Sequence, residues 1–203
     1  FAKLSEIPGF IAMTPMQVAS TFEIPDGMGI FCKTKHVIVG GGSIDAKLEK
    51  ELMECPNAVW STYGRTETLS HLALRRVSGE NATSWYSPLP GINVSISERG
   101  TLCIDAPMLH DGILETNDIA ELDTSNGRFR ILGRTDNVIN SGGVKIQIEE
   151  VEERLQSLCP SVQFMLTSCP DSILGEKCVL LIQKSTDEMA KKKIIGSVLP
   201  TKE

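Results

Sequence analysis

Several features that mark common classes of protein are scarce in this chain of 203 residues. Aromatic residues make up only 5% of it, and the formal net charge is −6. A stacking platform for single-stranded nucleic acid and a basic surface for phosphate backbones are therefore disfavoured. No uncharged apolar run approaches the length of a membrane span. We expect a globular protein that binds no nucleic acid and has no membrane span.

Patterns for metals and dinucleotides are missing as well. The six cysteines contain no C-x-x-C pair, and no two of the three histidines stand four residues apart. Zinc sites and the disulfide frameworks of short secreted domains need closer spacing. We expect reduced, mostly buried thiols in a cytoplasmic protein. Neither G-x-G-x-x-G nor G-x-x-x-x-G-K occurs, so the common dinucleotide and phosphate loops are excluded.

What the N-terminal third does contain is a strand, turn, helix and strand in succession. Residues 36–39 are an apolar run that ends in the glycine-rich turn 40–43. Residues 45–54 place apolar side chains at helical spacing, and residues 57–61 predict a second strand. This βαβ pattern is typical of a mostly parallel sheet, which binds ligands at the carboxyl ends of its strands. We interpret residues 11–18 as a helix and loop.

The rest of the chain shows two further sequence patterns. From about Leu72, short alternating segments and an Asn126-Gly127 hairpin turn predict a β-barrel-like or meander subdomain. After Asp136, the pattern predicts a compact α+β module, with strands at 144–148, 161–168 and 178–182 and helices at 149–158 and 186–198. The expected fold class is α/β plus a β-barrel-like subdomain, followed by a small α+β C-terminal domain. We place the domains at 1–135 and 136–203.

The loop that follows the strand at 57–61 carries residues suited to nucleotide chemistry. Residues 61–68 read Ser-Thr-Tyr-Gly-Arg-Thr-Glu-Thr. The ring of Tyr63 can stack on a base, the hydroxyl of Thr66 can reach a phosphate, and the carboxylate of Glu67 can hold Mg²⁺. The alternative is a capped helix start, with Thr66 as the N-cap and an acid in the first turn. The segment alone leaves both interpretations open.

Two later segments are also candidates. Residues 133–152 place Arg134 two residues before Asp136, then a glycine pair, a strand-like run and a helix start. A glycine pair can hold backbone close to a ligand or at positive φ. The alternative is a plain hairpin between two domains. Residues 116–118, Thr-Asn-Asp, end in a carboxylate, and here the alternative is an Asx turn between strands.

Together these segments resemble, in order, the motifs of the adenylate-forming acyl- and aryl-CoA synthetases. Residues 63–67 match the family's Y-G-x-T-E, and residues 40–42 fall where the family has a G-G turn. Residues 116–118 stand at its T-G-D, with Asn117 departing from glycine, and residues 100–107 resemble G-E-L-x-V-x-G-P. Residues 133–148 resemble the hinge and first strands of its small C-terminal domain.

The resemblance implies an enzyme that uses ATP, Mg²⁺ and CoA to turn a carboxylic acid into an acyl-adenylate and then into a thioester. Thr66 and Glu67 would be catalytic, with Glu67 holding Mg²⁺, and Asp136 would be the hinge between domains. For Lys145, a solvated lysine on a strand is an equal alternative. The implied nucleotide-binding residues are Gly41, Gly42, Tyr63, Gly64, Thr66, Asp118 and Arg134, and the implied CoA-binding residues are Gly142, Gly143 and Lys145.

Within the superfamily, residues 68–71 and 141–146 look most like the branch that acts on o-succinylbenzoate in menaquinone synthesis. The alternatives are another acyl- or aryl-CoA ligase, an adenylation domain that loads a carrier protein, and a non-catalytic binding remnant. Neither the family's phosphate loop nor its Gly-Lys motif is found, and Lys202 does not take the lysine's role. We expect a piece of a longer enzyme, inactive by itself, with homo-oligomerisation left open.

Overall fold

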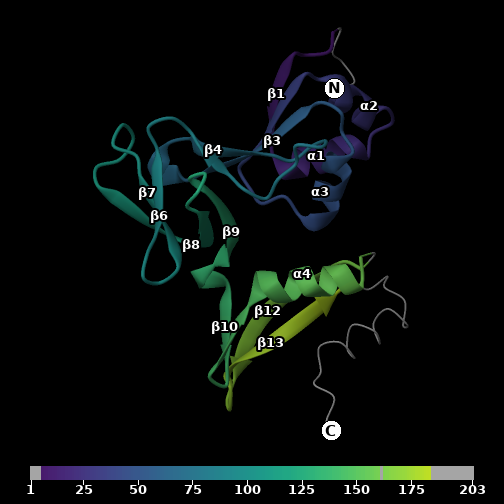
Figure 1. Cartoon of the computed structure of the whole chain (residues 1–203). Coiled ribbons are helices and arrows are strands. Elements are labelled where there is room, and N and C mark those ends of the chain that lie inside the picture. The colour runs from purple at the N-terminus through teal and green to yellow at the C-terminus, as the bar shows by residue number, and fades with distance from the viewer. Residues whose placement is uncertain (1–5, 161, 184–203) are drawn as a thin grey trace. The chain divides into compact units, whose positions relative to one another are not determined.

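The structure is a computed structural model that describes residues 6–160 and 162–183, and it divides into two compact units (Figure 1). Unit 1 comprises Phe1–Thr116 and Glu121–Arg130, and unit 2 comprises Asn117–Ala120 and Ile131–Glu203. Two strands are divided between the units: β8 (Ile113–Asp123) contributes Asn117–Ala120 to unit 2 and its two ends to unit 1, and β9 (Arg128–Arg134) contributes its first three residues to unit 1 and the rest to unit 2. A domain boundary at Asp136 stays a prediction.

Unit 1 is built on a five-stranded sheet with the order β1-β2-β3-β4-β5. The pairs β1–β2 and β2–β3 are parallel, whereas β4 is antiparallel to both of its neighbours. The predicted βαβ unit is therefore confirmed. The strands are β1 (Phe10–Met13), β2 (His36–Val39), β3 (Ala58–Gly64), β4 (His71–Arg76) and β5 (Ser87–Pro88).

The helices of this unit are α1 (Pro15–Phe22), α2 (Gly27–Lys33) and α3 (Ala46–Met53). The interpretation of residues 11–18 as a helix and loop was wrong for its first part, because strand β1 pairs with β2 there. Helix α1 begins only after Thr14, whose side chain accepts from the amide of Gln17 in a capping box. Pro15 at the first helical position favours the same start.

The core of unit 1 packs helices against this sheet. Val18 of α1, Phe31 of α2 and Leu52 of α3 are fully buried with Val37 and Val59 of the sheet. Each such side chain contributes about 1.5–3 kcal/mol when it leaves water. This packing fixes the strands, and with them the loops at their carboxyl ends.

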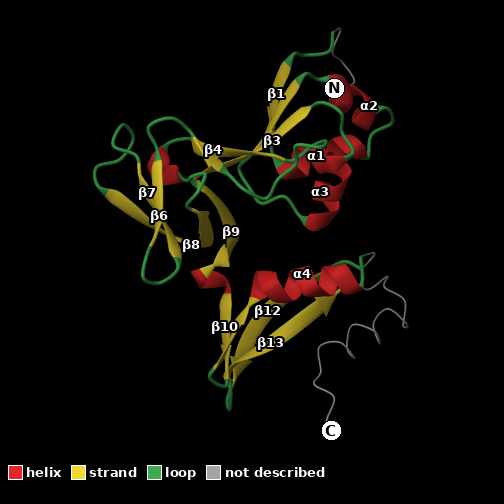
Figure 2. Ribbon diagram, viewed as in Figure 1, coloured by secondary structure: helices red, strands yellow, loops and turns green. Residues whose placement is uncertain are grey.

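A second sheet follows, with four strands in the order β6-β7-β8-β9 (Figure 2). Strand β6 spans Asn93–Ile96 and β7 spans Thr101–Asp105. Strand order equals chain order, which is the meander predicted from the alternating segments. Asn126 and Gly127 lie in the turn between β8 and β9, and Gly127 has the positive φ (64°) for which glycine is suited.

The described part of unit 2 contains a four-stranded sheet with the order β11-β10-β13-β12 and the helix α4. Helix α4 (Ile148–Leu158) buries Leu155 in a small core with Cys159 and Val162. The predicted helix at 186–198 lies outside the described residues. The strands are β10 (Val138–Ser141), β11 (Val144–Gln147), β12 (Phe164–Asp171) and β13 (Gly175–Ile182), and β10 was missing from our prediction.

In the described ranges, no helix is long and apolar enough to cross a membrane.

Candidate functional site

The glycine turn after β2 brings backbone close to the ends of two other strands. The amide of Gly40 donates to the carbonyl of Met13 at the end of β1 (3.0 Å). A Cβ on Gly40 would lie 2.2 Å from Oγ1 of Thr62 in β3, so a side chain there would require Thr62 to move. Gly41 has φ of +78°, which favours glycine. The predicted residues Gly41 and Gly42 therefore lie in a close backbone turn at the carboxyl ends of parallel strands, where such sheets bind ligands.

Strand β3 ends in the Tyr63-Gly64 pair, where its register with β4 shifts. The ring of Tyr63 is half-buried and packs edge-on against Phe129, with 5.2 Å between ring centroids, and at 5.8 Å from Tyr86. A Cβ on Gly64 would lie 2.5 Å from the carbonyl oxygen of Ser70, so only glycine fits. This aromatic cluster (Tyr63, Tyr86, Phe129) anchors the start of the loop.

The loop continues as a single 3-10 turn, η1 (Thr66–Thr68). Arg65, and not Thr66, takes the N-cap position, so the alternative of a helix capped by Thr66 was wrong. Thr68 is fully buried, and its Oγ1 accepts from the amide of Arg65 (3.1 Å) and lies 3.1 Å from the carbonyl oxygen of Ser70. These contacts hold Leu69 at φ of +59°, a strained angle for a residue with a side chain.

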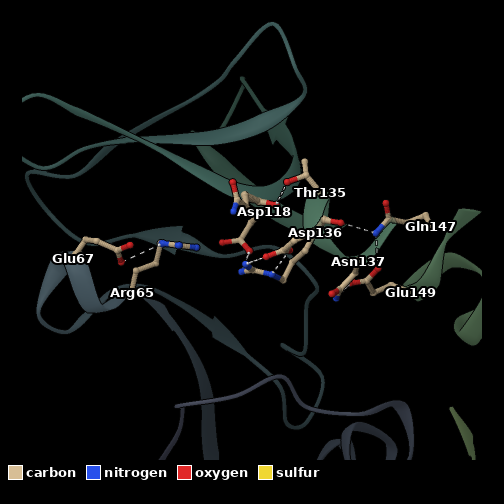
Figure 3. A network of polar contacts seen from close by, with 10 residues as sticks. Arg65, Glu67, Asp118, Thr135, Asp136, Asn137, Gln147 and Glu149 are labelled. Atoms are coloured by element: carbon tan, nitrogen blue, oxygen red, sulfur yellow. Dashed lines mark hydrogen bonds and ion pairs between the residues drawn. The ribbon is translucent and has the colours of Figure 1, made fainter. Parts of the chain in front are cut away.

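Thr66 and Glu67 are exposed on this loop. Oε2 of Glu67 lies 3.5 Å from Nε of Arg65, as Figure 3 shows. A hydrogen bond from its own backbone N–H and the charge of Arg65 lower the pKa of Glu67 below its usual value. The carboxylate is therefore ionised at neutral pH and accessible to a cation.

Glu67 fits a magnesium site of one particular kind. In the part of the chain that the structure describes, no three His, Cys, Asp or Glu residues gather into a metal-binding group. Mg²⁺ in phosphate-transfer sites is commonly held by one or two carboxylates, with substrate phosphates and water completing its shell. The single ionised carboxylate of Glu67 suits that arrangement and not an all-protein cage.

Unit 2 brings three of the other predicted residues together. Arg134 at the end of β9 donates from Nη1 to Oδ1 of Asp118 in β8 (2.8 Å). It also makes a bidentate contact with Asp136, from Nε to Oδ1 (2.8 Å) and from Nη2 to Oδ2 (2.6 Å). The bonds to Asp136, followed by the charge of Asp118, raise the pKa of Arg134. Because Asp118 lies inside a strand, the alternative of an Asx turn at 116–118 was wrong.

The segment after Arg134 is another 3-10 turn, η2 (Thr135–Asn137), and none of its residues is buried. Two side chains that sequence reasoning missed hold it (Figure 3). Nε2 of Gln147 donates to the backbone oxygen of Arg134 (3.0 Å), and Nδ2 of Asn137 donates to Oε1 of Glu149 (2.6 Å). The one signal in the sequence was the pair of polar residues where β11 meets α4.

The glycine pair forms the hairpin loop between β10 and β11. Gly142 and Gly143 have φ of +58° and +86°, as a two-residue hairpin with both central residues at positive φ requires. The amide of Gly142 donates to the carbonyl of Leu174 (2.9 Å). Lys145 is exposed on β11, and no described contact separates a binding role from that of a solvated lysine.

The predicted site residues thus fall into two groups, each with its own geometry. One group lies in unit 1: Gly41, Gly42, Tyr63, Gly64, Thr66 and Glu67. The other lies in unit 2: Asp118, Arg134, Asp136, Gly142, Gly143 and Lys145.

Comparison with known proteins gives similar proteins for almost the whole chain, although no family model matches it. The 2-succinylbenzoate–CoA ligase of Lactococcus lactis is 29% identical over 162 residues, which cover 72% of this chain. The chain spans only 36% of the length of that relative.

Solved structures give the same picture. An acyl-CoA synthetase (AMP-forming)/AMP-acid ligase II-like protein from Dyadobacter fermentans is 33% identical, with a TM-score of 0.62 over 97% of this chain and 57% of its own. Wild-type MenE of E. coli, with a bound analogue of OSB-AMS, has a TM-score of 0.68 over 95% of this chain and 45% of its own. At 23% identity, that second likeness concerns the fold alone.

Proposed function

The chain belongs to the adenylate-forming superfamily of acyl- and aryl-CoA synthetases and has part of their fold, and from this premise we propose that its protein is an acid–CoA ligase. One observation carries the proposal. A single chain holds an exposed Thr66-Glu67 loop at the end of a buried strand and a separate Arg134 network around a carboxylate. The first group offers a hydroxyl and a metal-binding carboxylate to phosphates, and the second offers a carboxylate to ribose hydroxyls.

In the first half-reaction, a carboxylate of the substrate attacks the α-phosphorus of ATP and displaces pyrophosphate. The hydroxyl of Thr66 donates to a phosphate oxygen, and Glu67 would hold Mg²⁺, which when bound would supply positive charge to the phosphates. Tyr63 and the turn at Gly41 and Gly42 lie beside the base. Asp118 accepts from the ribose hydroxyls, and Arg134 keeps that carboxylate in place. Most of the rate gain in such a step comes from positioning and charge stabilisation.

In the second half-reaction, the thiolate of CoA attacks the acyl carbonyl and AMP leaves. Asp136 is the pivot at which the C-terminal part changes its orientation between the two steps. Gly142 and Gly143 allow a ligand to approach the backbone of their loop closely, and Lys145 follows two residues after Gly143. The exposed polar turn around Asp136 supports this role, because few packed contacts resist its rotation.

We propose that the acid substrate is o-succinylbenzoate and that the protein acts in the cytoplasm. The support is the Lactococcus lactis relative and the match of residues 68–71 and 141–146 to that branch. The second candidate function is that of an acyl- or aryl-CoA ligase with another aromatic or aliphatic acid as its substrate.

The test uses the full-length protein with a panel of aromatic and aliphatic acids. We expect acid-dependent exchange of pyrophosphate into ATP, together with thioester formation from CoA, and the highest kcat/KM for o-succinylbenzoate. Adenylation without transfer to CoA would point to a carrier-loading domain. No exchange with any acid would leave a non-catalytic binding protein and overturn the proposal.

A further inference from the structure

A chain of polar contacts runs beside the turn that contains Asp136. The carboxamide of Gln147 donates from Nε2 to the backbone oxygen of Arg134 (3.0 Å) and also to the carboxylate of Glu149. The other oxygen of Glu149 accepts from Nδ2 of Asn137 (2.6 Å). Gln147, Glu149 and Asn137, which are labelled in Figure 3, are each half-buried. Their bonds are therefore partly shielded from water.

Glu149 fixes which way the Gln147 carboxamide points. A carboxylate and a backbone carbonyl both accept hydrogen bonds and cannot donate them. Turning the carboxamide over would place its oxygen against two other oxygens, so only the orientation with Nε2 inward is favourable. Nε2 of Gln147 is therefore oriented to donate to the carbonyl of Arg134.

Gly133 lies close to the ends of the same two side chains. A Cβ at Gly133 would lie 2.6 Å from Nε2 of Gln147 and 3.1 Å from Oε2 of Glu149. Gly133 does not have positive φ, so its lack of a side chain serves space and not backbone conformation. Both Gly133 and Arg134 precede the pivot, whereas Gln147 and Glu149 follow it. Rotation of the backbone at Asp136 therefore moves Gln147 away from Gly133 and Arg134.

We propose that Gln147 is a positioning residue. Its hydrogen bond to the carbonyl of Arg134, here called the latch, stabilises the described conformation of the hinge and breaks when the protein changes from one half-reaction to the other. This inference rests on the proposed function. The bond from Asn137 to Glu149 lies wholly after the pivot and stays intact during the rotation. The bond from Gln147 to Arg134 crosses the pivot and must break.

The test compares Gln147→Met and Gln147→Glu in the full-length protein. Methionine keeps the length of the side chain but removes the donor, and glutamate adds a charge that repels Glu149. Gln156→Met is the matched control, because Gln156 makes the same kind of bond, to the backbone oxygen of Pro160 (2.9 Å), away from the hinge. We measure amide hydrogen exchange across residues 133–138 and the ratio of the two half-reaction rates.

Loss of one such bond should speed exchange in the hinge by about threefold to tenfold in Gln147→Met, and by more in Gln147→Glu. The ratio of adenylation to thioester formation should change by a similar factor, while Gln156→Met leaves both readouts as in the wild type. Unchanged exchange, or an equal loss of both half-reactions, would overturn the latch. If the protein has no ligase activity, the proposed function fails, and the exchange data still decide whether Gln147 restrains the hinge.

Discussion

Turns η1 and η2, the two 3-10 turns within residues 6–160 and 162–183, are both single turns but are stabilised by different interactions. Turn η1 follows a strand anchored by the aromatic cluster, and its last residue, Thr68, is fully buried. Turn η2 has no buried residue and is held by polar side chains, among them those of Gln147 and Glu149. Moving η1 requires unpacking of a core, whereas moving η2 requires only the exchange of a few hydrogen bonds with water.

The difference matches the proposed roles of the two regions. A loop that aligns phosphates must keep its geometry throughout the cycle. A pivot must adopt two backbone conformations of similar free energy, so its contacts must be individually weak. Substitutions in each region test whether packing dominates in the first and polar contacts in the second.

The largest effect on folding should come from Phe129→Ala. Phe129 is fully buried and lies 5.2 Å from Tyr63 and 5.5 Å from Tyr86, between ring centroids. Removing a buried phenyl ring costs about 3–5 kcal/mol. Denaturant unfolding of the full-length protein should show this loss, together with faster exchange in residues 63–69. Phe10→Ala, at a side chain that is 56% exposed, is the control and should change stability much less.

A smaller loss should follow Leu155→Ala in unit 2. Leu155 is 3% exposed, but its core cluster is small. We expect a destabilisation of about 2–3 kcal/mol, near the low end for a buried leucine. Hydrogen exchange should rise across α4, β12 and β13 and leave β3 unchanged. Equal destabilisation of β3 would show that the two units unfold as one and would remove the basis of the comparison.

The smallest effect should come from the turn aspartate of unit 1. Hydrogen bonds from Ser125 and Asn126, and then from Arg128, lower the pKa of Asp123 below its ordinary value. A lowered folded-state pKa means that the carboxylate stabilises the protein above the unfolded pKa of about 3.9. That stability is lost as the pH falls through the folded-state pKa.

Asp123→Asn should therefore lower the melting temperature slightly at pH 7, and the difference from wild type should shrink steadily below pH 4. Asp171 provides the counterpart in unit 2, because amides of Leu174 and Ile173 lower the pKa of its carboxyl group. Asp171→Asn should show the same pH dependence. A difference that stays constant down to pH 2 would assign the effect to geometry and not to charge.

The sequence predicted the elements whose causes are local. Helix α3 has its N-cap at Asp45, where the side chain accepts from two amides, and the Asn126-Gly127 turn forms the expected hairpin. Strand β1 was not predicted, because its pairing with β2 joins residues 26 apart in the chain (Phe10 with His36). The role of Gln147 was not predicted for the same reason, since its hydrogen-bond partner, Arg134, lies 13 residues away in the chain. Contacts between distant segments leave no periodic trace in a single sequence.

The most direct test of the account is a comparison of the two half-reactions in two variants of the full-length protein. Glu67→Gln removes the proposed Mg²⁺ ligand, and Asp136→Pro fixes φ near −65° and restricts Thr135 before it. Asp136→Ala is the control that removes the carboxylate but leaves the backbone free to rotate.

We predict opposite patterns. Glu67→Gln should slow adenylation strongly, leave the fold intact and spare thioester formation from a supplied acyl-adenylate. Asp136→Pro should reduce thioester formation by orders of magnitude while adenylation survives, and Asp136→Ala should retain both steps to a larger extent. Loss of the same half-reaction in both variants, or of neither, would contradict the division between a fixed loop and a moving hinge.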